Sequence, residues 1–236
     1  VEVSAGAVLV RLTAGPRMPI EEIRGLLVRP ARLEFRLVDA RNKELTARLL
    51  DQGVAPDGYR VVRAGNEAYY AREQGTGGVA DSPEQRERLA RFGAPDDNCD
   101  LMLEKTYRDG QFLFKPVYVM RRCELSGEFL KEARVDYDSM SRPMISIAFD
   151  ESGTRTFASV TADYAPGGAR NPDPASRRQI AIVLDGTLFS APAIREAIRG
   201  GRAVISGSFS VAEATRQADA LRAGPRHDGG PRLRRL

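Results

Sequence analysis

The stretch that decides the fold is QIAIVLDGTLFS, residues 179–190. Five consecutive apolar residues at 180–184 have the length of a buried strand, and Thr187–Ser190 resumes the apolar pattern after Asp185-Gly186. An Asp-Gly pair between two such runs is the strongest short sequence signal for a type I′ β-hairpin. The segment therefore predicts two antiparallel strands joined by a two-residue turn.

Several other segments have strand patterns. LEFRLV at 33–38 alternates apolar and charged side chains, as a half-buried strand does. Leu101–Lys105 and Gln111–Lys115 are separated by Arg108-Asp109-Gly110, which predicts a second hairpin. Further strands are expected at Ala7–Leu12, Arg134–Tyr137, Met144–Phe149 and Arg202–Phe209.

Helix signals lie between these strands. Ser210 and Glu213 have the spacing of a capping box, and Gly224 ends the helix that they begin. The other expected helices run from Pro19 to Leu27, from Ser82-Pro83, from Ser126 with Phe129, Leu130 and Ala133, and from Ser152 with Phe157, Val160 and Tyr164. The region after Val38 is rich in turn signals, and 165–176 has the composition of a loop. The mixture predicts an α+β fold with mostly antiparallel sheets.

The composition is that of a folded protein, and its basic excess lies at one end. Of 236 residues, 42% are hydrophobic and 29% are charged, and no run reaches the roughly 18 to 20 apolar residues of a membrane-spanning helix. The net charge is +4, and Arg222–Leu236 alone contributes five arginines and one acid. We expect 226–236 to be a flexible, solvated basic tail. The alternative is a tail that contacts phosphates, as in a phosphate-binding adaptor; the neutral body gives no reason to expect a nucleic-acid partner.

The sequence offers little chemistry for catalysis or metal binding. The lone histidine, His227, lies in the tail, and Cys99 and Cys123 form no metal-binding spacing, so no catalytic residue, metal or cofactor is expected. The two cysteines are a disulfide or two free thiols; the sequence does not separate these cases. One enzymatic alternative is a secreted or surface hydrolase that uses a carboxylate pair from Asp136, Asp138, Asp150 and Glu151. Turn and helix-start positions give these four residues a structural explanation instead.

Several linked motifs resemble one family. LSGEFLKEARV (125–135) resembles the Leu-Thr-Gly-x-x-Leu-x-x-Ala-x-Val segment of SecD, a bacterial protein-export membrane subunit. IAIVLDGTLFSAPAIREAIRGG (180–201) is similar to that family's most recognisable run. Other similar segments, in the same order along the chain, are 31–39, 53–62, 143–161 and 203–224. The resemblance covers most of 1–62 and 125–224.

The resemblance implies a periplasmic, extracytoplasmic domain attached to the bacterial plasma membrane through flanking helices that are not in this chain. Its fold would be an incomplete ferredoxin-like base, 1–40 plus 202–225, with an inserted α+β head at 41–201. The family's first strand and helix of the base would precede Val1, and the ending PRHDGGPRLRRL departs from the family's apolar continuation. The implied function is to hold unfolded preprotein during proton-gradient-driven export. The implied partners are that translocating chain, the Sec channel and a SecF-like protein.

Two groups of residues are candidates for this function. The crossings between base and head would form a hinge, and the head would contact polypeptide through exposed apolar side chains. The structural alternatives are ordinary turn glycines and core burial. The hinge candidates are Asp39, Asn42, Ile198, Gly200 and Gly201. The candidate polypeptide contacts are Phe112, Phe114, Tyr118, Met120 and Phe189.

Overall fold

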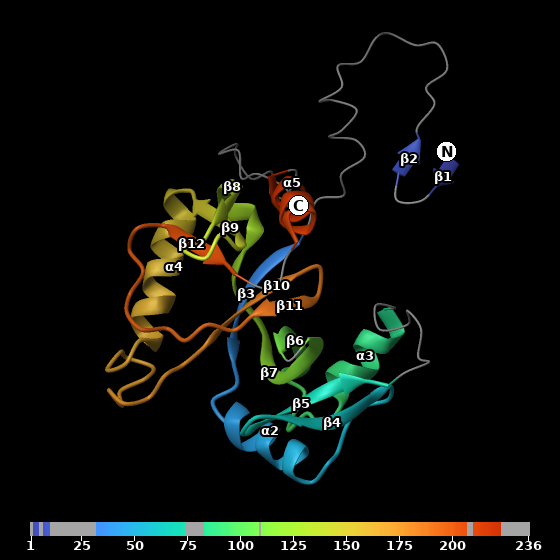
Figure 1. Ribbon diagram of the computed structural model, residues 1–236. Coiled ribbons are helices and arrows are strands. Elements are labelled where there is room, and N and C mark those ends of the chain that lie inside the picture. Colours follow the sequence, from blue (N-terminus) through green and yellow to red (C-terminus); the bar gives the residue numbers. More distant parts are fainter. Residues whose placement is uncertain are drawn as a thin grey trace, which may run out of the picture.

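The computed structural model describes residues 2–4, 7–9, 32–73, 83–108, 110–206 and 210–222 (Figure 1). The helices are α2 (Asn42–Asp51), α3 (Pro83–Arg91), the 3₁₀ turn η2 (Gly127–Phe129), α4 (Glu151–Tyr164) and α5 (Val211–Arg222). The strands are β1 (Glu2–Ser4), β2 (Ala7–Leu9), β3 (Leu33–Val38), β4 (Tyr59–Ala64), β5 (Glu67–Arg72), β6 (Cys99–Arg108), β7 (Gln111–Ser126), β8 (Leu130–Tyr137), β9 (Pro143–Phe149), β10 (Ile180–Leu184), β11 (Thr187–Ser190) and β12 (Arg202–Ile205). The strand pairs of the described residues are antiparallel, which confirms the α+β class with antiparallel sheets.

The larger sheet is organised by β7, which is 16 residues long. Its strand order is β11-β10-β3-β7-β5-β4, and β6 pairs with the other edge of β7. β3 pairs with the C-terminal half of β7, and β5 pairs with the N-terminal half of β7 through Tyr70 and Phe114. One strand therefore joins the part of the molecule near β10 to the part near α2 and α3 (Figure 1).

The main core lies between the larger sheet and the smaller sheet β12-β9-β8 with its helices α4 and α5. Phe35, Phe149 and Phe157 meet there with ring centroids 5.1 to 5.5 Å apart. Val117, Val119 and Val183 pack on the opposite face of the larger sheet. A further cluster around Tyr118 fills the space beneath α2 and α3.

Most local sequence signals predict the structure correctly. Asp185 and Gly186 have φ angles of 50° and 75°, as a type I′ turn requires, and the hairpin that they join is confirmed. Ser210 and Glu213 form the predicted capping box, with Ser210 N 2.8 Å from Glu213 Oε2 and Glu213 N 3.2 Å from Ser210 Oγ. The predicted helix at 19–27 and the ends of two predicted strands, at 10–12 and 207–209, lie outside the described residues.

Two predictions of local structure are wrong. The helix expected from Ser126 is a single 3₁₀ turn followed by β8, because residues 130–137 pair with β9. The region after Val38 is more ordered than its turn signals indicate, since it contains α2 and the β4–β5 hairpin.

Strand pairing groups the chain differently from the division expected from the resemblance. β3, expected in the base, lies between β10 and β7, which were expected in the head. β12 pairs with β9, and α5 packs on β8 and β9. Hydrogen bonding therefore joins 33–38, 202–205 and the intervening segment into shared sheets. Most of the segment 1–31 lies outside the described residues, as does the tail 226–236.

Candidate functional site

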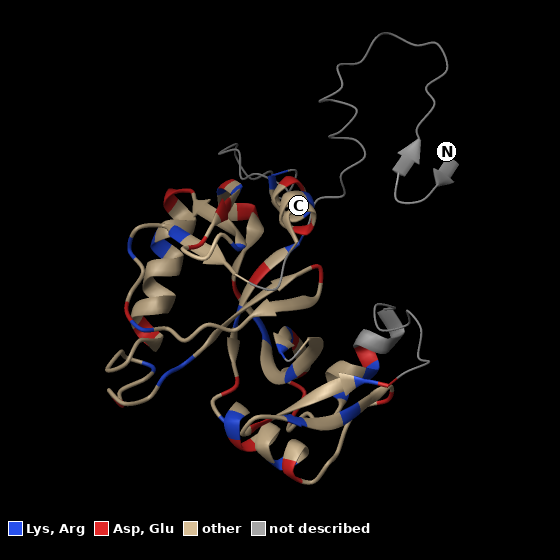
Figure 2. Ribbon diagram, in the orientation of Figure 1, with Lys and Arg blue, Asp and Glu red and all other residues tan. Residues whose placement is uncertain are grey.

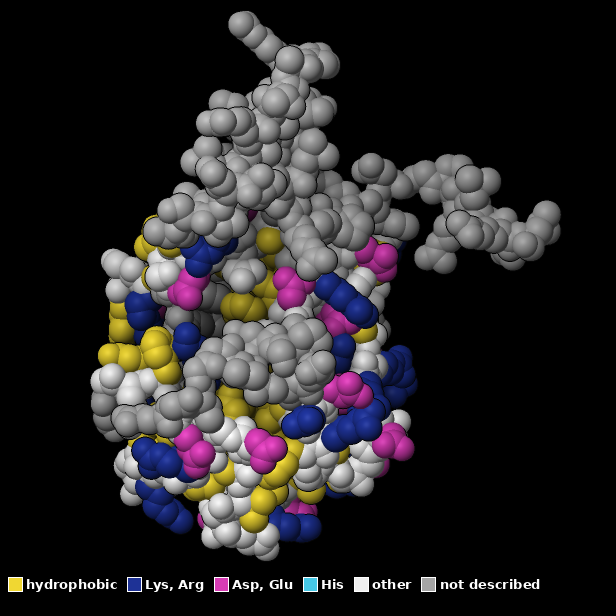
Figure 3. Space-filling model, turned by 90° about the vertical axis from the view of Figure 1, so that its right-hand side faces the viewer, with side chains coloured by type: hydrophobic (Ala, Val, Ile, Leu, Met, Phe, Trp, Pro, Cys, Tyr) yellow, Lys and Arg dark blue, Asp and Glu magenta, His cyan; other side chains and the backbone are white. Residues whose placement is uncertain are grey.

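Two adjoining pockets form a groove beside β6, with β11 on its opposite wall. The apolar pocket has a volume of about 380 Å³ and the polar pocket of about 1060 Å³. β6 supplies residues 101–103 and 105 to the apolar pocket and residues 104–108 to the polar pocket, and Lys105 and Phe112 line both. Figure 3 views the molecule from the side on which β6, β11 and α3 lie in Figure 1, and some apolar side chains are visible near its middle among charged ones. We call the two pockets together the β6–β11 groove.

The β6–β7 hairpin places an edge of β6 that has no strand partner among the described residues in this groove. Arg108 and Gln111 flank a two-residue turn, so alternate pairs from this point exchange backbone hydrogen bonds across the hairpin. The bond from Arg121 N to Asn98 O, at 2.7 Å, fits this alternation. The backbone groups of Leu101, Leu103 and Lys105 therefore point away from β7. Among the described strands, β6 forms a ladder with β7 alone.

Aromatic rings and two cations form one side of the apolar pocket. The Tyr59 and Phe114 rings meet edge to face with centroids 5.5 Å apart. The Arg72 guanidinium lies 5.2 Å from the Phe114 centroid, and Lys105 Nζ lies 3.9 Å from the Phe112 centroid. Such contacts hold a cation over a ring face without neutralising its charge.

The polar pocket contains charges of both signs. Its acids are Glu67, Glu104, Asp138 and Glu213, and its bases are Lys105, Arg108, Lys115 and Arg142. Arg142 Nη2 lies 2.7 Å from Asp138 Oδ2, so this pair is satisfied locally. Burial raises the pKa of Glu104, although Lys115 and the backbone of Ala191 oppose the shift. Hydrogen bonds from Ser210 lower the pKa of Glu213, and Lys105 adds to that lowering.

Three of the five predicted polypeptide contacts lie in this groove. Phe112 is 49% exposed and lines both pockets, Phe114 is 8% exposed and lines the apolar pocket, and Phe189 lines the polar pocket. Met120 is packed against two core clusters. Tyr118 is fully buried, so its prediction as a contact residue is wrong. Its ring fills the core beneath α2 and α3, and its hydroxyl donates to the carbonyls of Gly93 and Phe92 at 2.8 and 3.2 Å.

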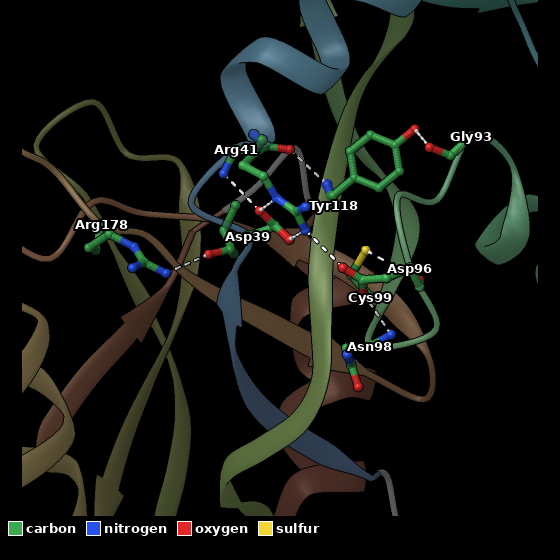
Figure 4. Close-up of polar contacts among 10 residues, drawn as sticks. Asp39, Arg41, Gly93, Asp96, Asn98, Cys99, Tyr118 and Arg178 are labelled. Atoms are coloured by element: carbon green, nitrogen blue, oxygen red, sulfur yellow. Dashed lines mark hydrogen bonds and ion pairs between the residues drawn. The ribbon is translucent and has the colours of Figure 1, made fainter. Parts of the chain in front are cut away.

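The hinge candidates Asp39 and Asn42 follow the end of β3, whose pairing with β7 stops at Val38 and Val119, and Figure 4 shows Asp39 beside Tyr118 of β7. Tyr118 is the first residue of β7 beyond this pairing, so β3 offers no strand partner to its backbone groups. Asn42 Oδ1 accepts from Tyr118 N at 2.7 Å, and Asp39 N donates to Tyr118 O at 2.9 Å. The two residues therefore satisfy backbone groups that the end of β3 would leave without partners.

A charged cluster fixes the same crossing. Asp39 is 7% exposed, and its carboxylate accepts from Arg41 N, Nε and Nη2 at 2.7, 3.1 and 2.8 Å. Arg41 Nη2 also donates to Asp96 Oδ2 at 2.9 Å. Hydrogen bonding from Arg41 lowers the pKa of both carboxyl groups. Arg178 Nη2 donates to the carbonyl of Val38 at 3.2 Å, so the crossing is held from two sides.

Of the other hinge candidates, Ile198 and Gly201 contact α4. Ile198 N donates to Thr161 Oγ1 at 2.8 Å. Gly201 has a φ of 63°, and a Cβ there would lie 2.1 Å from Thr154 Oγ1. A Cβ at Gly200 would meet no atom within 4 Å. Gly201 is thus required by its conformation and by close packing, whereas Gly200 has space around it.

Comparison with known proteins identifies the family. Residues 103–225, just over half of the chain, match the family model described as the SecDF P1 head subdomain. The chain belongs to the SecDF family. The matched segment contains β12 and α5, in agreement with their packing on β8 and β9.

Individual relatives are similar over about half of the chain. The protein translocase subunit SecD of Magnetococcus marinus is 35% identical over 130 residues, which are 55% of this chain and 23% of that protein. The SecD of Calditerrivibrio nitroreducens is 40% identical over 117 residues, 49% of this chain and 20% of that protein. The matched segments thus span about a fifth of the length of these relatives. A solved structure of SecDF, described as a membrane component that enhances protein export, is 23% identical with a TM-score of 0.47, and covers 93% of this chain and 79% of that one.

In this SecDF-family chain, the four carboxylates considered for hydrolysis have separate local roles. Asp150 caps α4 by accepting from Gly153 N at 2.7 Å, and Glu151 pairs with Arg155 one turn later. Asp136 accepts from Ser146 Oγ at 3.1 Å, and Asp138 binds the backbone and side chain of Arg142. Hydrogen bonds lower the pKa of Asp136 and Asp138, opposite to what a general acid needs.

The cysteines are free thiols, with Cys99 buried and Cys123 exposed. Over the described ranges, no three His, Cys, Asp or Glu side chains gather as a metal site requires. No described helix has both the length and the apolarity needed to cross a bilayer.

The sequence interpretation did not include Tyr59, Arg72 and Lys105 as site residues. They come from β4, β5 and β6, and the pairing of β5 and β6 with opposite edges of β7 brings them together. The available signal was the hairpin pattern of 101–105 and 111–115 around Arg108-Asp109-Gly110, which predicts a strand but does not identify its free edge.

Proposed function

We propose that this chain is the extracytoplasmic domain of a SecD-type subunit of the bacterial Sec protein-export machinery, and that it holds unfolded polypeptide in the β6–β11 groove. The observation that carries the proposal is the groove itself, which combines an apolar pocket, exposed aromatic rings and an open edge of β6. Membership of the SecDF family supports the assignment to protein export.

These features suit an extended chain of varied sequence. Backbone groups along a strand edge bind any polypeptide, because every residue except proline offers both a donor and an acceptor. The apolar pocket adds affinity for hydrophobic side chains, which an unfolded chain exposes and a folded protein buries. Phe112 and Tyr107, 49% and 55% exposed with ring centroids 5.2 Å apart, form an aromatic surface next to this edge. Binding is therefore expected to be micromolar and broadly specific.

The wider function that we propose follows the family. The chain would lie on the periplasmic face of the plasma membrane, attached through membrane helices outside this sequence. The translocating preprotein, the Sec channel and a SecF-like protein would be its partners, and proton-gradient-driven movement would involve the membrane part. Within this chain, the segment at Ile198–Gly201 is the proposed hinge, with Gly200 as the position around which a side chain would meet no neighbouring atom.

The test is binding of a fluorescently labelled, unfolded secretory polypeptide to the whole chain, followed by anisotropy at moderate and high salt. We expect salt-tolerant micromolar binding that Phe112→Ser weakens by about tenfold, the loss of one exposed aromatic contact. Val54→Ser is the matched control, because Val54 is also an exposed apolar residue and lines neither pocket. Thermal unfolding of each variant verifies that the fold is intact.

Two results would contradict the proposal. Absence of binding to any unfolded chain would remove the holding function. Equal weakening by Phe112→Ser and Val54→Ser would place the binding surface outside the groove.

A further inference from the structure

The apolar pocket has an uneven charge. Among its lining residues are two cations, Arg72 and Lys105, and no carboxylate. Neither cation forms an ion pair with a carboxylate among the residues that the structure describes, and each lies over an aromatic ring. Lys105 acts electrostatically on Glu213 in the polar pocket, which is hydrogen-bonded to Ser210. The apolar pocket thus presents positive charge to whatever enters it.

The remaining walls are hydrophobic. Leu89 of α3, Leu101 and Leu103 of β6 and Leu188 of β11 line the space beside the aromatic rings. A volume of about 380 Å³ is near the lower end of the range of ligand pockets, roughly 300 to 1,000 Å³. The space suits one or two apolar side chains. Cations at the border of such a space are less screened than on open surface, since apolar walls exclude part of the water.

The polar pocket does not share this preference. Its four acids are balanced by four bases only when Lys105, which lines both pockets, is included, and Asp138 and Arg142 already neutralise each other. A polypeptide that lies along the groove therefore meets a neutral environment at one end and a positive one at the other. Discrimination by charge must come from the apolar pocket.

We propose that the apolar pocket selects polypeptide segments in which an apolar side chain stands next to Asp or Glu, and disfavours segments with Lys or Arg there. This inference rests on the proposed polypeptide-holding function. The apolar side chain enters between Leu101 and Leu188, and the neighbouring carboxylate pairs with Arg72 or Lys105. In an extended chain, side chains two positions apart project from the same face at about 6.6 to 7 Å, so a carboxylate two positions from the bound apolar side chain is within reach of both long cations.

The test uses three labelled peptides that differ only in the residues flanking a central Leu-Phe-Leu, which are Asp, Ser or Lys. Their affinities for the whole chain are measured by anisotropy. We expect the order Asp, Ser, Lys, with about two- to fivefold between neighbours, as for partly exposed ion pairs, and a smaller spread at high salt.

Charge-changing variants separate the pocket from the overall field of the protein. Lys105→Glu is expected to favour the Lys-flanked peptide over the Asp-flanked one, and Lys105→Gln to reduce the spread without inverting it. Lys131→Glu is the matched control, because Lys131 is exposed on β8, lines neither pocket and changes the net charge equally.

The possible failures are distinguishable. Equal binding of all three peptides would overturn the charge selection and leave polypeptide holding intact. Failure of every peptide and of unfolded secretory protein to bind would overturn the proposed function, and the inference with it. Equal effects of Lys131→Glu and Lys105→Glu would show that net charge, not the apolar pocket, sets the preference.

Discussion

Arg41 binds both carboxylate oxygens of Asp39, with Nε 3.1 Å from Oδ1 and Nη2 2.8 Å from Oδ2 (Figure 4). The same guanidinium reaches Asp96, 55 residues further along the chain. The crossing from β3 to α2 is therefore attached to the loop before β6. The sequence predicts a hinge at Asp39 and Asn42, whereas in the structure these contacts attach the crossing to the rest of the protein.

Arg41→Gln is expected to reduce stability in a pH-dependent way. The pKa of Asp39 is lowered in the folded protein, so its stabilising contribution is present above its ordinary value of 3.8 and is lost as pH falls through the lowered value. The urea midpoint of the variant should be below that of the wild type at pH 7, and the difference should shrink below about pH 4. Arg48→Gln, which breaks an exposed pair with Glu44, should have little effect at either pH. A difference that is the same at pH 3 and pH 7 would exclude the ion pair as its cause.

Gly200→Ala and Gly201→Ala should differ strongly although the residues are adjacent. Gly201 adopts a positive φ, which costs a non-glycine residue about 1–2 kcal/mol, and its new Cβ would overlap Thr154. Gly200→Ala should change the free energy of unfolding by no more than about 0.5 kcal/mol. Adding Thr154→Ala to Gly201→Ala should recover the steric part of the loss but not the conformational part. Chemical denaturation measures all four proteins, and equal losses at both glycines would contradict the packing described.

Glu104→Gln should stabilise the protein at neutral pH. Burial raises the pKa of Glu104 in the folded state, so its favourable contribution exists below the unfolded value, about 4.3, and is lost as pH rises through the folded value. The neutral amide avoids that loss and keeps an oxygen to accept from Ala191. The variant should therefore gain in urea midpoint over the wild type at pH 7 and match it near pH 4. Glu132→Gln, at an exposed position on β8, should lack such a gain.

Tyr118→Phe should destabilise the fold without altering its outline. The hydroxyl donates to the carbonyls of Gly93 and Phe92 in a fully buried position, and its removal leaves both acceptors without this donor. The expected loss is about 1–2 kcal/mol. Tyr137→Phe, at a residue 51% exposed, should be neutral in the same unfolding experiment. Burial also raises the pKa of Tyr118 to about 12, so its ultraviolet titration should lie above that of an exposed tyrosine.

Local turn and cap chemistry explains which elements were predictable. Asp185-Gly186 and the Ser210–Glu213 box act within a few residues, so short sequence patterns contain the whole signal. LKEA at 130–133 has good helix formers but forms the start of β8, because Leu130, Glu132 and Ala133 pair with β9, whereas the strand expected at Arg134–Tyr137 is present. For the β4–β5 hairpin the signal was present, since Gly65-Asn66 is a recognised hairpin turn between two short apolar runs.

The site was less predictable than the fold. Phe112, Phe114 and Phe189 could be selected as apolar residues near hairpins, but an exposed Phe112 and a buried Tyr118 have the same sequence pattern. Which one faces solvent depends on α2 and α3, because Leu45, Leu49 and Leu89 pack with Tyr118 over the middle of β7. The cations of the apolar pocket, Arg72 and Lys105, are on different strands, β5 and β6, and only the pairing along β7 brings them together. Over the described residues, Lys and Arg alternate with Asp and Glu across the surface, so overall charge gives no guide to the pocket (Figure 2).

The hydrogen bonds of the β6–β7 ladder oppose sliding of the two strands past each other more strongly than they oppose separation of the strands. Its ten residue pairs are in continuous register, and their hydrogen bonds lie perpendicular to the strands. Tension along β6 therefore loads these bonds together in shear, whereas a pull at right angles opens the hairpin one pair at a time. A polypeptide lying along the groove runs beside β6, so tension in it would act in the shear direction. β7 would then transmit that tension through the hydrogen bonds that it shares with β3, and from β3 to β10.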